Sequence, residues 1–289
     1  MKARFPSSAA DAFAMLADEP EMIPLAGGTD LLVHWPDRHE FRDRTYLDLG
    51  RVAEFREHRW TEDALVIGAT TTYWDLIRDP RTIEELPLLV EAGRLVGAVQ
   101  IQSRGTWAGN IVNASPAADG VPVLMAYDAV LVLESAAGRE EVPLSDFYLG
   151  YKEMRRSADQ LVRQIRVPLA PRRRERFDKV GSRRAQAIAK VGLATLEAED
   201  GWRVVAASLA PTVRRCRSVE RLLDAGSSLD SPSDLLPALR SDVSPIDDIR
   251  STAEYREQVA ARILFYGPGG GTAGEGVRDG RSSHTPEES

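Results

Sequence analysis

The sequence predicts an α+β protein in which a large domain is followed by a smaller one. Its 289 residues correspond to about two domains at roughly 150 residues each. Strand-like runs at 65–69, 130–133 and 161–167 are separated by segments of helical pattern, including 11–16 and 84–98. This mixture, in which neither periodicity dominates, favours packed layers of helices and sheets.

The prolines at 168 and 171 end the last of these strand runs and predict the boundary between the two domains. The large domain then spans 1–170, with subdomains of about 1–57 and 58–170. A smaller α+β domain follows at 171–266. Residues 267–289 are rich in glycine and polar side chains and too poor in apolar ones to offset the entropy of ordering, so we predict a disordered tail.

Composition and charge exclude several classes of function. Hydrophobic residues make up 43% and charged residues 28% of the chain, as in ordinary globular proteins. The net charge of −7 argues against a nucleic-acid partner, which would require a basic surface. No apolar run reaches the roughly 18 residues of a membrane span. The N-terminal segment lacks the features of a signal peptide, so we expect a cytoplasmic location.

Cysteine and histidine content limits the metal chemistry. The single cysteine, Cys216, cannot form an intrachain disulfide or hold an iron–sulfur cluster, which takes about four thiolates. The four histidines do not have the spacing of metal ligands, so no metal site is predicted. The run 171–176 is locally basic, and two interpretations stay open: docking to an acidic partner or a solvated face.

The first informative segment, 25–32, reads Leu-Ala-Gly-Gly-Thr-Asp-Leu-Leu and follows a predicted strand. Glycines lack the Cβ that would keep a ligand away from the backbone, so successive N–H groups can turn toward an anion such as a diphosphate. The alternative is a tight turn between a strand and a helix, capped by Thr29 or Asp30. The segment has neither the P-loop nor the dinucleotide-binding pattern.

The second informative segment is 104–119, which we expect to be a loop between two apolar stretches. It contains polar side chains suited to ribityl and ribose hydroxyls, and small residues that leave room for contact with the backbone. The alternative is a connecting loop whose side chains satisfy its own backbone. The polar candidates are Thr106, Asn110, Asn113, Ser115 and Asp119, and the small residues are Ala108 and Gly109.

Taken as an ordered pair, these segments resemble the two flavin-binding signatures of the FAD-binding (medium) subunit of molybdenum hydroxylases. That family includes the flavoprotein subunits of carbon monoxide dehydrogenase and xanthine dehydrogenase. The resemblance extends over about 1–266 and takes in 46–49, 67–71, 86–89 and 210–212. It implies a two-part FAD-binding domain of the vanillyl-alcohol-oxidase (PCMH-like) type, followed by the small C-terminal α+β domain.

The resemblance also implies which residues bind FAD. The diphosphate would be surrounded by Leu25, Ala26, Gly27, Gly28, Thr29, Asp30 and Leu31. The second wall would consist of Thr106, Ala108, Gly109 and Asn110. Sugar or ribityl hydroxyls would be held by Asn113 and Asp119, and further cofactor contacts made by Leu161 and Lys179, with Ile188 near the flavin ring.

One departure from the family pattern concerns the second signature, where Trp107 and Ala108 stand in place of an aliphatic residue and a glycine. The methyl group of Ala108 would be costly if that position required a positive φ. We expect the side chain of Trp107 to lie in the core rather than to stack on the cofactor.

By this resemblance the chain is an oxidoreductase component, the electron-transfer flavoprotein of a heterotrimer. The molybdenum cofactor is expected on a large partner subunit and [2Fe–2S] clusters on a small one, with electrons leaving through FAD to a terminal acceptor. The flavin supplies the chemistry, so no catalytic acid, base or nucleophile is predicted. Two alternatives stay open: a stand-alone FAD oxidase or reductase, and an assembly subunit that has lost FAD.

Overall fold

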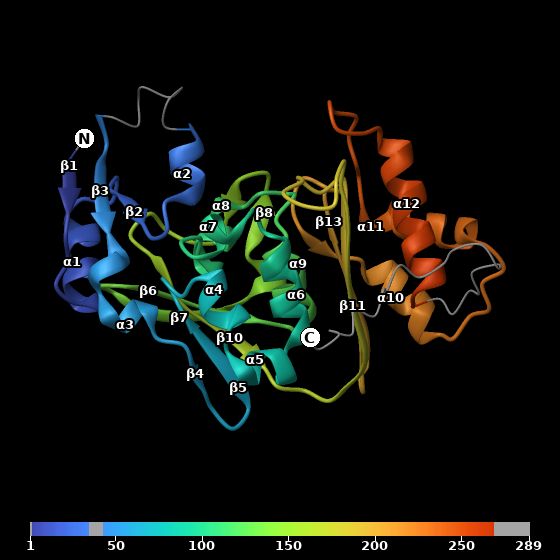
Figure 1. Ribbon diagram of the computed structural model, residues 1–289, viewed down its shortest axis with the longest axis horizontal. Coiled ribbons are helices and arrows are strands. Elements are labelled where there is room, and N and C mark those ends of the chain that lie inside the picture. Colours follow the sequence, from blue (N-terminus) through green and yellow to red (C-terminus); the bar gives the residue numbers. More distant parts are fainter. Residues whose placement is uncertain (1, 35–42, 269–289) are drawn as a thin grey trace, which may run out of the picture.

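The structure is a computed structural model that describes residues 2–34 and 43–268 of the 289. Its three larger sheets follow one another along the long axis of the molecule, and the last helices lie beyond the third sheet (Figure 1). Within the described ranges, no helix has the length and apolar character needed to cross a membrane. The predicted disordered tail lies outside the described residues from 269 onward.

The N-terminal part is built on a parallel three-stranded sheet in the order β1-β3-β2. Helix α1 begins after Ser8, whose hydroxyl accepts a hydrogen bond from the N–H of Asp11. Phe13 of this helix packs edge-on against Phe55, with ring centroids 6.0 Å apart. The elements are β1 (Lys2–Arg4), α1 (Ala9–Asp18), β2 (Ile23–Leu25), α2 (Thr29–His34), β3 (Thr45–Asp48), η2 (Leu49–Arg51) and α3 (Ala53–Arg56).

The middle part contains an antiparallel five-stranded sheet in the order β4-β5-β10-β6-β7. Ile165 lies between Ile67 and Leu131 on neighbouring strands, and all three side chains are fully buried in one core with the helices. The strands are β4 (Arg59–Trp60), β5 (Ala64–Gly68), β6 (Val130–Ser135), β7 (Gly138–Pro143) and β10 (Leu161–Pro168).

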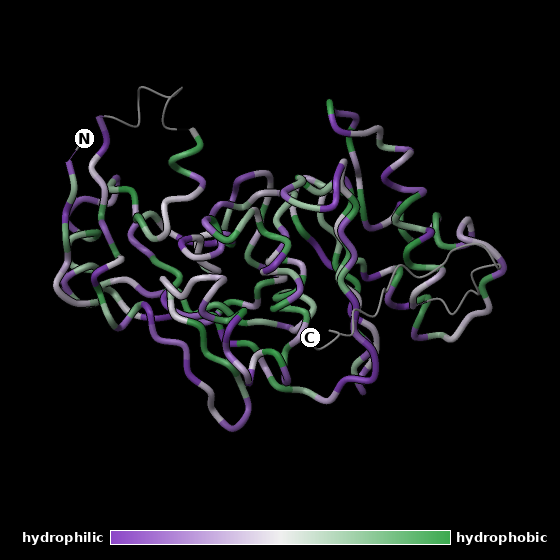
Figure 2. Tube along the Cα trace, in the orientation of Figure 1, coloured by the Kyte–Doolittle hydropathy of each residue, from purple (hydrophilic) through white to green (hydrophobic). Residues whose placement is uncertain are grey.

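Six short helices lie between β5 and β6. They are α4 (Tyr73–Ile77), α5 (Pro80–Glu85), α6 (Pro87–Leu95), α7 (Val99–Gln102), α8 (Trp107–Asn113) and α9 (Gly120–Ala126). Four of them, α4, α6, α8 and α9, supply the other side of this core. Between β7 and β10 come η3 (Leu144–Asp146), β8 (Tyr148–Gly150) and β9 (Glu153–Met154). Figure 2 shows hydrophobic colour along the strands in the middle of the molecule and hydrophilic colour at the tip of the β4–β5 hairpin.

The third sheet is antiparallel, in the order β11-β12-β13-β14, and its central strands β12 and β13 contribute buried residues on both faces. Successive side chains of a strand point to opposite faces. Ala194 and Leu196 therefore join the core of the middle part, while Val191 and Leu193 pack against the last helices. The elements are β11 (Arg172–Val180), β12 (Val191–Ala198), β13 (Gly201–Ala207), β14 (Arg214–Arg215), α10 (Arg217–Asp224), η4 (Pro232–Leu235), α11 (Leu236–Asp242) and α12 (Ala253–Tyr266).

The α+β prediction is confirmed, whereas the expectation of a loop at 104–119 is wrong in part. Residues 107–113 form helix α8, because the hydroxyl of Thr106 accepts a hydrogen bond from the N–H of Gly109 at 3.0 Å and starts the helix. The expectation that Trp107 lies in the core is confirmed, since its side chain is fully buried and its ring lies 4.8 Å from that of Tyr73.

Replacing Trp107 by alanine should lower the free energy of unfolding by about 3–5 kcal/mol, because the cavity left behind cannot close completely. Urea unfolding followed by circular dichroism measures this loss. Trp107→Phe should lose less, since it keeps a ring beside Tyr73 and the indole N–H has no partner among the described residues. Equal losses for the two variants would contradict this account.

Candidate functional site

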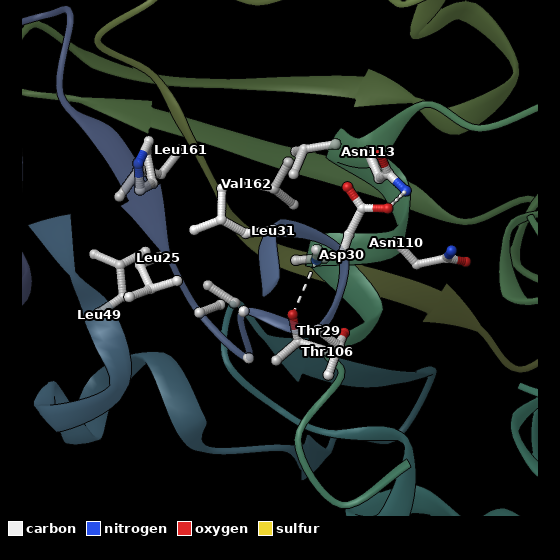
Figure 3. Close-up of a pocket in the computed structure, with 18 of the residues that line it drawn as sticks. Leu25, Thr29, Asp30, Leu31, Leu49, Thr106, Asn110, Asn113, Leu161 and Val162 are labelled. Carbon is white, nitrogen blue, oxygen red and sulfur yellow. Dashed lines mark hydrogen bonds between the residues drawn. The ribbon is translucent and has the colours of Figure 1, made fainter. Parts of the chain in front are cut away.

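A cavity of about 580 Å³ lies where the start of α2, helix α8 and the start of β10 come together. Figure 3 shows Leu25 and Leu49 on one side of it and Asn113 on the other. Small-molecule sites in proteins have volumes of roughly 300–1,000 Å³ and apolar walls with a few polar groups. The cavity therefore has the size and lining of a site for a large organic ligand.

The two glycine-containing segments meet at the floor of this cavity. A Cβ added at Gly27 would lie only 1.9 Å from the carbonyl oxygen of Arg104 and 3.1 Å from the Cα of Gly105. A Cβ at Gly105 would in turn lie 3.3 Å from the hydroxyl oxygen of Thr29. Real Cβ atoms do not approach a backbone oxygen so closely, so the contact between the two segments requires glycine at 27.

The first segment presents unpaired backbone donors. Gly28 has φ +71°, in the left-handed region that favours glycine, and helix α2 starts at the next residue. The N–H groups of Thr29, Asp30 and Leu31 have no hydrogen-bond partner among the described residues, as is usual for the first turn of a helix. These residues line the cavity, so the segment offers N–H donors to an anionic group.

Polar side chains join the two segments on the other side. The side-chain amide of Asn113 donates a hydrogen bond of 3.0 Å to the carboxylate of Asp30 (Figure 3). Lys152 donates to the side-chain oxygen of Asn113 at 3.0 Å and also to its backbone carbonyl. Asp30 is thus fixed by a neutral partner that belongs to helix α8, which ties α2 to α8.

The second segment contributes the first turn of helix α8. Thr106 uses its hydroxyl to cap the helix, and a Cβ at Gly109 would lie 2.7 Å from that oxygen. The side-chain oxygen of Asn110 is buried without a hydrogen-bond partner among the described residues. A buried acceptor without a donor is unfavourable, and a ligand hydroxyl would satisfy it.

The structure brings the predicted site residues to this one cavity, with three exceptions. The lining includes 25–31, Thr106, Ala108, Gly109, Asn110, Asn113 and Leu161. Asp119 and Lys179 are absent from the lining and form an ion pair of 2.7 Å with each other between α9 and β11. Ile188, predicted near the flavin ring, is also absent from the lining and is 56% exposed.

The Asp119–Lys179 pair is nearly buried, with 13% and 8% of the two side chains exposed. Burial disfavours the ionised carboxyl and raises the pKa of Asp119 to about 6, although the ammonium of Lys179 acts in the opposite direction. Lys179 also donates to the carbonyl of Leu95 at 3.0 Å. The pair therefore joins the C-terminal sheet to the helices of the large domain.

Several lining residues were not predicted from the sequence. Arg156 and Gln160 reach the cavity from the turn before β10, and Tyr73 and Leu49 complete its apolar surface. The sequence did contain one signal for Arg156 and Gln160. Both are polar and come shortly before the strand that carries Leu161, a predicted cofactor contact.

A family model described as the FAD binding domain in molybdopterin dehydrogenase matches residues 1–170, more than half of the chain. The chain belongs to this family. A second model, the CO dehydrogenase flavoprotein C-terminal domain, matches residues 176–267. The resemblance stated from the two signatures is thus confirmed, and FAD is the cofactor of the family's domain.

Two relatives and one solved structure illustrate the similarity. A putative xanthine dehydrogenase FAD-binding subunit of Escherichia coli (strain K12) is 32% identical over 256 residues, covering 86% of this chain and 87% of its own. The carbon monoxide dehydrogenase medium chain of Hydrogenophaga pseudoflava is 30% identical over 267 residues, covering 90% and 92%. A solved carbon monoxide dehydrogenase structure from that organism superposes with a TM-score of 0.82 at 27% identity, covering 91% and 94%.

The departure at Trp107 and Ala108 carries no backbone strain in this family member. Ala108 lies in helix α8, is not among the residues of positive φ, and is 5% exposed. Its methyl group joins the core of the middle part, and Trp107 points away from the cavity lining. The residues present are therefore compatible with FAD.

Gly27→Ala should separate the two segments and lower FAD occupancy of the purified protein by at least about tenfold, because the added methyl would overlap the carbonyl of Arg104. The ratio of flavin to protein absorbance measures occupancy. Gly226→Ala is the control for general destabilisation: it strains the backbone at φ +62° but has nothing within 4 Å and lies in the C-terminal domain, away from the cavity lining. Equal occupancy in both variants would contradict the site.

Lys179→Met should raise the pKa of Asp119 above its value of about 6, because the variant removes the opposite charge. Carboxyl NMR of the FAD-free chain measures the pKa, with Lys2→Met as the control remote from the pair. The folded chain holds this proton to about pH 6 and the unfolded chain only to about pH 4, so the contribution of Asp119 to stability falls as pH rises between them. An unchanged pKa in Lys179→Met would contradict the pairing.

Proposed function

We propose that this chain is the electron-transfer flavoprotein subunit of a multi-subunit molybdenum hydroxylase. Its partners in this proposal are a large subunit with the molybdenum cofactor and a small subunit with [2Fe–2S] clusters, in a cytoplasmic heterotrimer. FAD, when bound, supplies the redox chemistry and connects the clusters to a terminal acceptor. The domain limits, 1–170 and 171–266, belong to the same proposal.

The observation that carries the proposal is the meeting of residues 25–31 with residues 104–110 around one cavity, in a chain of the FAD-binding family. Its relatives include a medium chain of carbon monoxide dehydrogenase and a putative FAD-binding subunit of xanthine dehydrogenase. Both names describe one component of a larger enzyme. The chain aligns with them over most of their length, so the same division of labour is the simplest inference.

In this proposal the chain's own residues bind and orient the cofactor. The free N–H groups of 29–31 hold the diphosphate through backbone hydrogen bonds. The unpaired oxygen of Asn110 accepts from a cofactor hydroxyl. Leu25, Leu49 and Leu161 exclude water from the apolar side of the cavity. Asp30 stays in place through Asn113 and keeps the two walls together.

The need for partner subunits follows from the cysteine content. The chain has one cysteine, Cys216, which is fully buried among the C-terminal helices. Burial and nearby carboxylates raise the pKa of its thiol, which keeps it protonated and unsuited to metal binding. An iron–sulfur cluster takes about four thiolates, so clusters that deliver electrons to this flavin must lie on another chain.

The test is to purify the chain with and without its small subunit and record the absorption spectrum. We expect flavin bands, release of FAD identified by mass spectrometry, and loss of the flavin bands when the reduced small subunit is mixed in anaerobically. A folded but colourless protein that takes up no FAD would support the assembly-subunit alternative. Full turnover of an organic substrate by the isolated chain would support the stand-alone oxidase or reductase.

A further inference from the structure

The cavity contains an uneven set of charges. Among the described residues that line it, Asp30 is the acidic side chain and Arg156 is the basic one. Lys152 lies nearby but contacts Asn113 and is not part of the lining. Asp30 would repel the negative charges of a diphosphate, so a cation at the cavity wall matters for the binding of an anionic ligand.

Arg156 is held in place by its own turn. It lies between β9 and β10, and its backbone N–H donates to the carbonyl of Met154 at 2.9 Å. One terminal nitrogen, Nη1, donates to the carbonyls of Ser157 and Gln160 at 3.1 and 3.0 Å. The guanidinium is therefore fixed from one side, and its position does not depend on a bound ligand.

One further nitrogen of the guanidinium has no partner. Its Nε is buried without a hydrogen-bond partner, and no carboxylate of the described residues forms an ion pair with Arg156. Burial lowers the pKa of Arg156, which reflects the cost of a desolvated cation without a counter-charge. Guanidinium groups bind phosphate oxygens through parallel N–H bonds and are weakly hydrated, which suits a site of this kind.

Resting on the proposed function, we propose that Arg156 binds the FAD diphosphate and gives the cavity its preference for an anionic nucleotide. The backbone donors of 29–31 supply direction, and Arg156 supplies the positive charge that they lack. Its neighbour Arg155 is exposed and does not line the cavity. The two arginines carry the same charge, and only Arg156 has it at the cavity wall.

The experiment measures FAD affinity of the cofactor-free full chain by flavin fluorescence at several salt concentrations. Arg156→Gln should weaken FAD binding by about tenfold and make the affinity less sensitive to salt, since screening acts on the charge that was removed. Arg156→Lys keeps the charge and should lose less. Arg155→Gln, which removes the same charge outside the cavity, should bind FAD like the unaltered chain.

Thermal unfolding of each variant separates binding from a structural role. If Arg156 serves only to hold its turn, Arg156→Gln will lower the melting temperature and leave the salt dependence unchanged, and the inference is overturned. Equal FAD affinities of Arg156→Gln and Arg155→Gln would also overturn it while leaving the proposed function intact. Failure of the unaltered chain to bind FAD would overturn the proposed function, and this inference with it.

Discussion

Close packing of two backbone segments at Gly27 governs the geometry of the cavity. The segment after β2 and the segment before α8 are distant in sequence, and they meet where no side chain fits between them. Because of this contact, helices α2 and α8 start near each other, and their first turns line the same space. The Asp30–Asn113 hydrogen bond then joins the helices themselves. The relative position of the two cavity walls is therefore set by a contact between main-chain atoms.

The sequence could predict the α+β class, the two segments and the membership of the family, because glycine and small residues leave a clear local pattern. It could not predict that 107–113 is helical. The segment Trp-Ala-Gly-Asn-Ile-Val-Asn has low intrinsic helix propensity, and the helix is stabilised by the cap at Thr106 and the burial of Trp107 and Ile111. Tertiary contacts decide the conformation here, and sequence periodicity does not report them.

Long-range pairing explains the other differences. Asp119 and Lys179 are 60 residues apart in sequence, and only the folded chain shows that each satisfies the other. Arginines of the basic run 171–176 also form ion pairs with acidic residues of the chain. Arg174 lies 3.1 Å from Glu197, and Arg176 lies 2.7 Å from Asp178. Much of its charge is thereby balanced within the chain, which favours the solvated-face interpretation of that run over docking to an acidic partner.

The third sheet separates two hydrophobic cores and belongs to both of them. A fragment ending at residue 170 would leave the inner surfaces of α6 and α9 without the strand residues that cover them, including Ala194, Leu196 and Val205. Newly exposed apolar area of that kind promotes aggregation. The chain should therefore not be truncated at the boundary predicted from the sequence. The FAD-binding domain needs residues of the C-terminal sheet to complete its hydrophobic core.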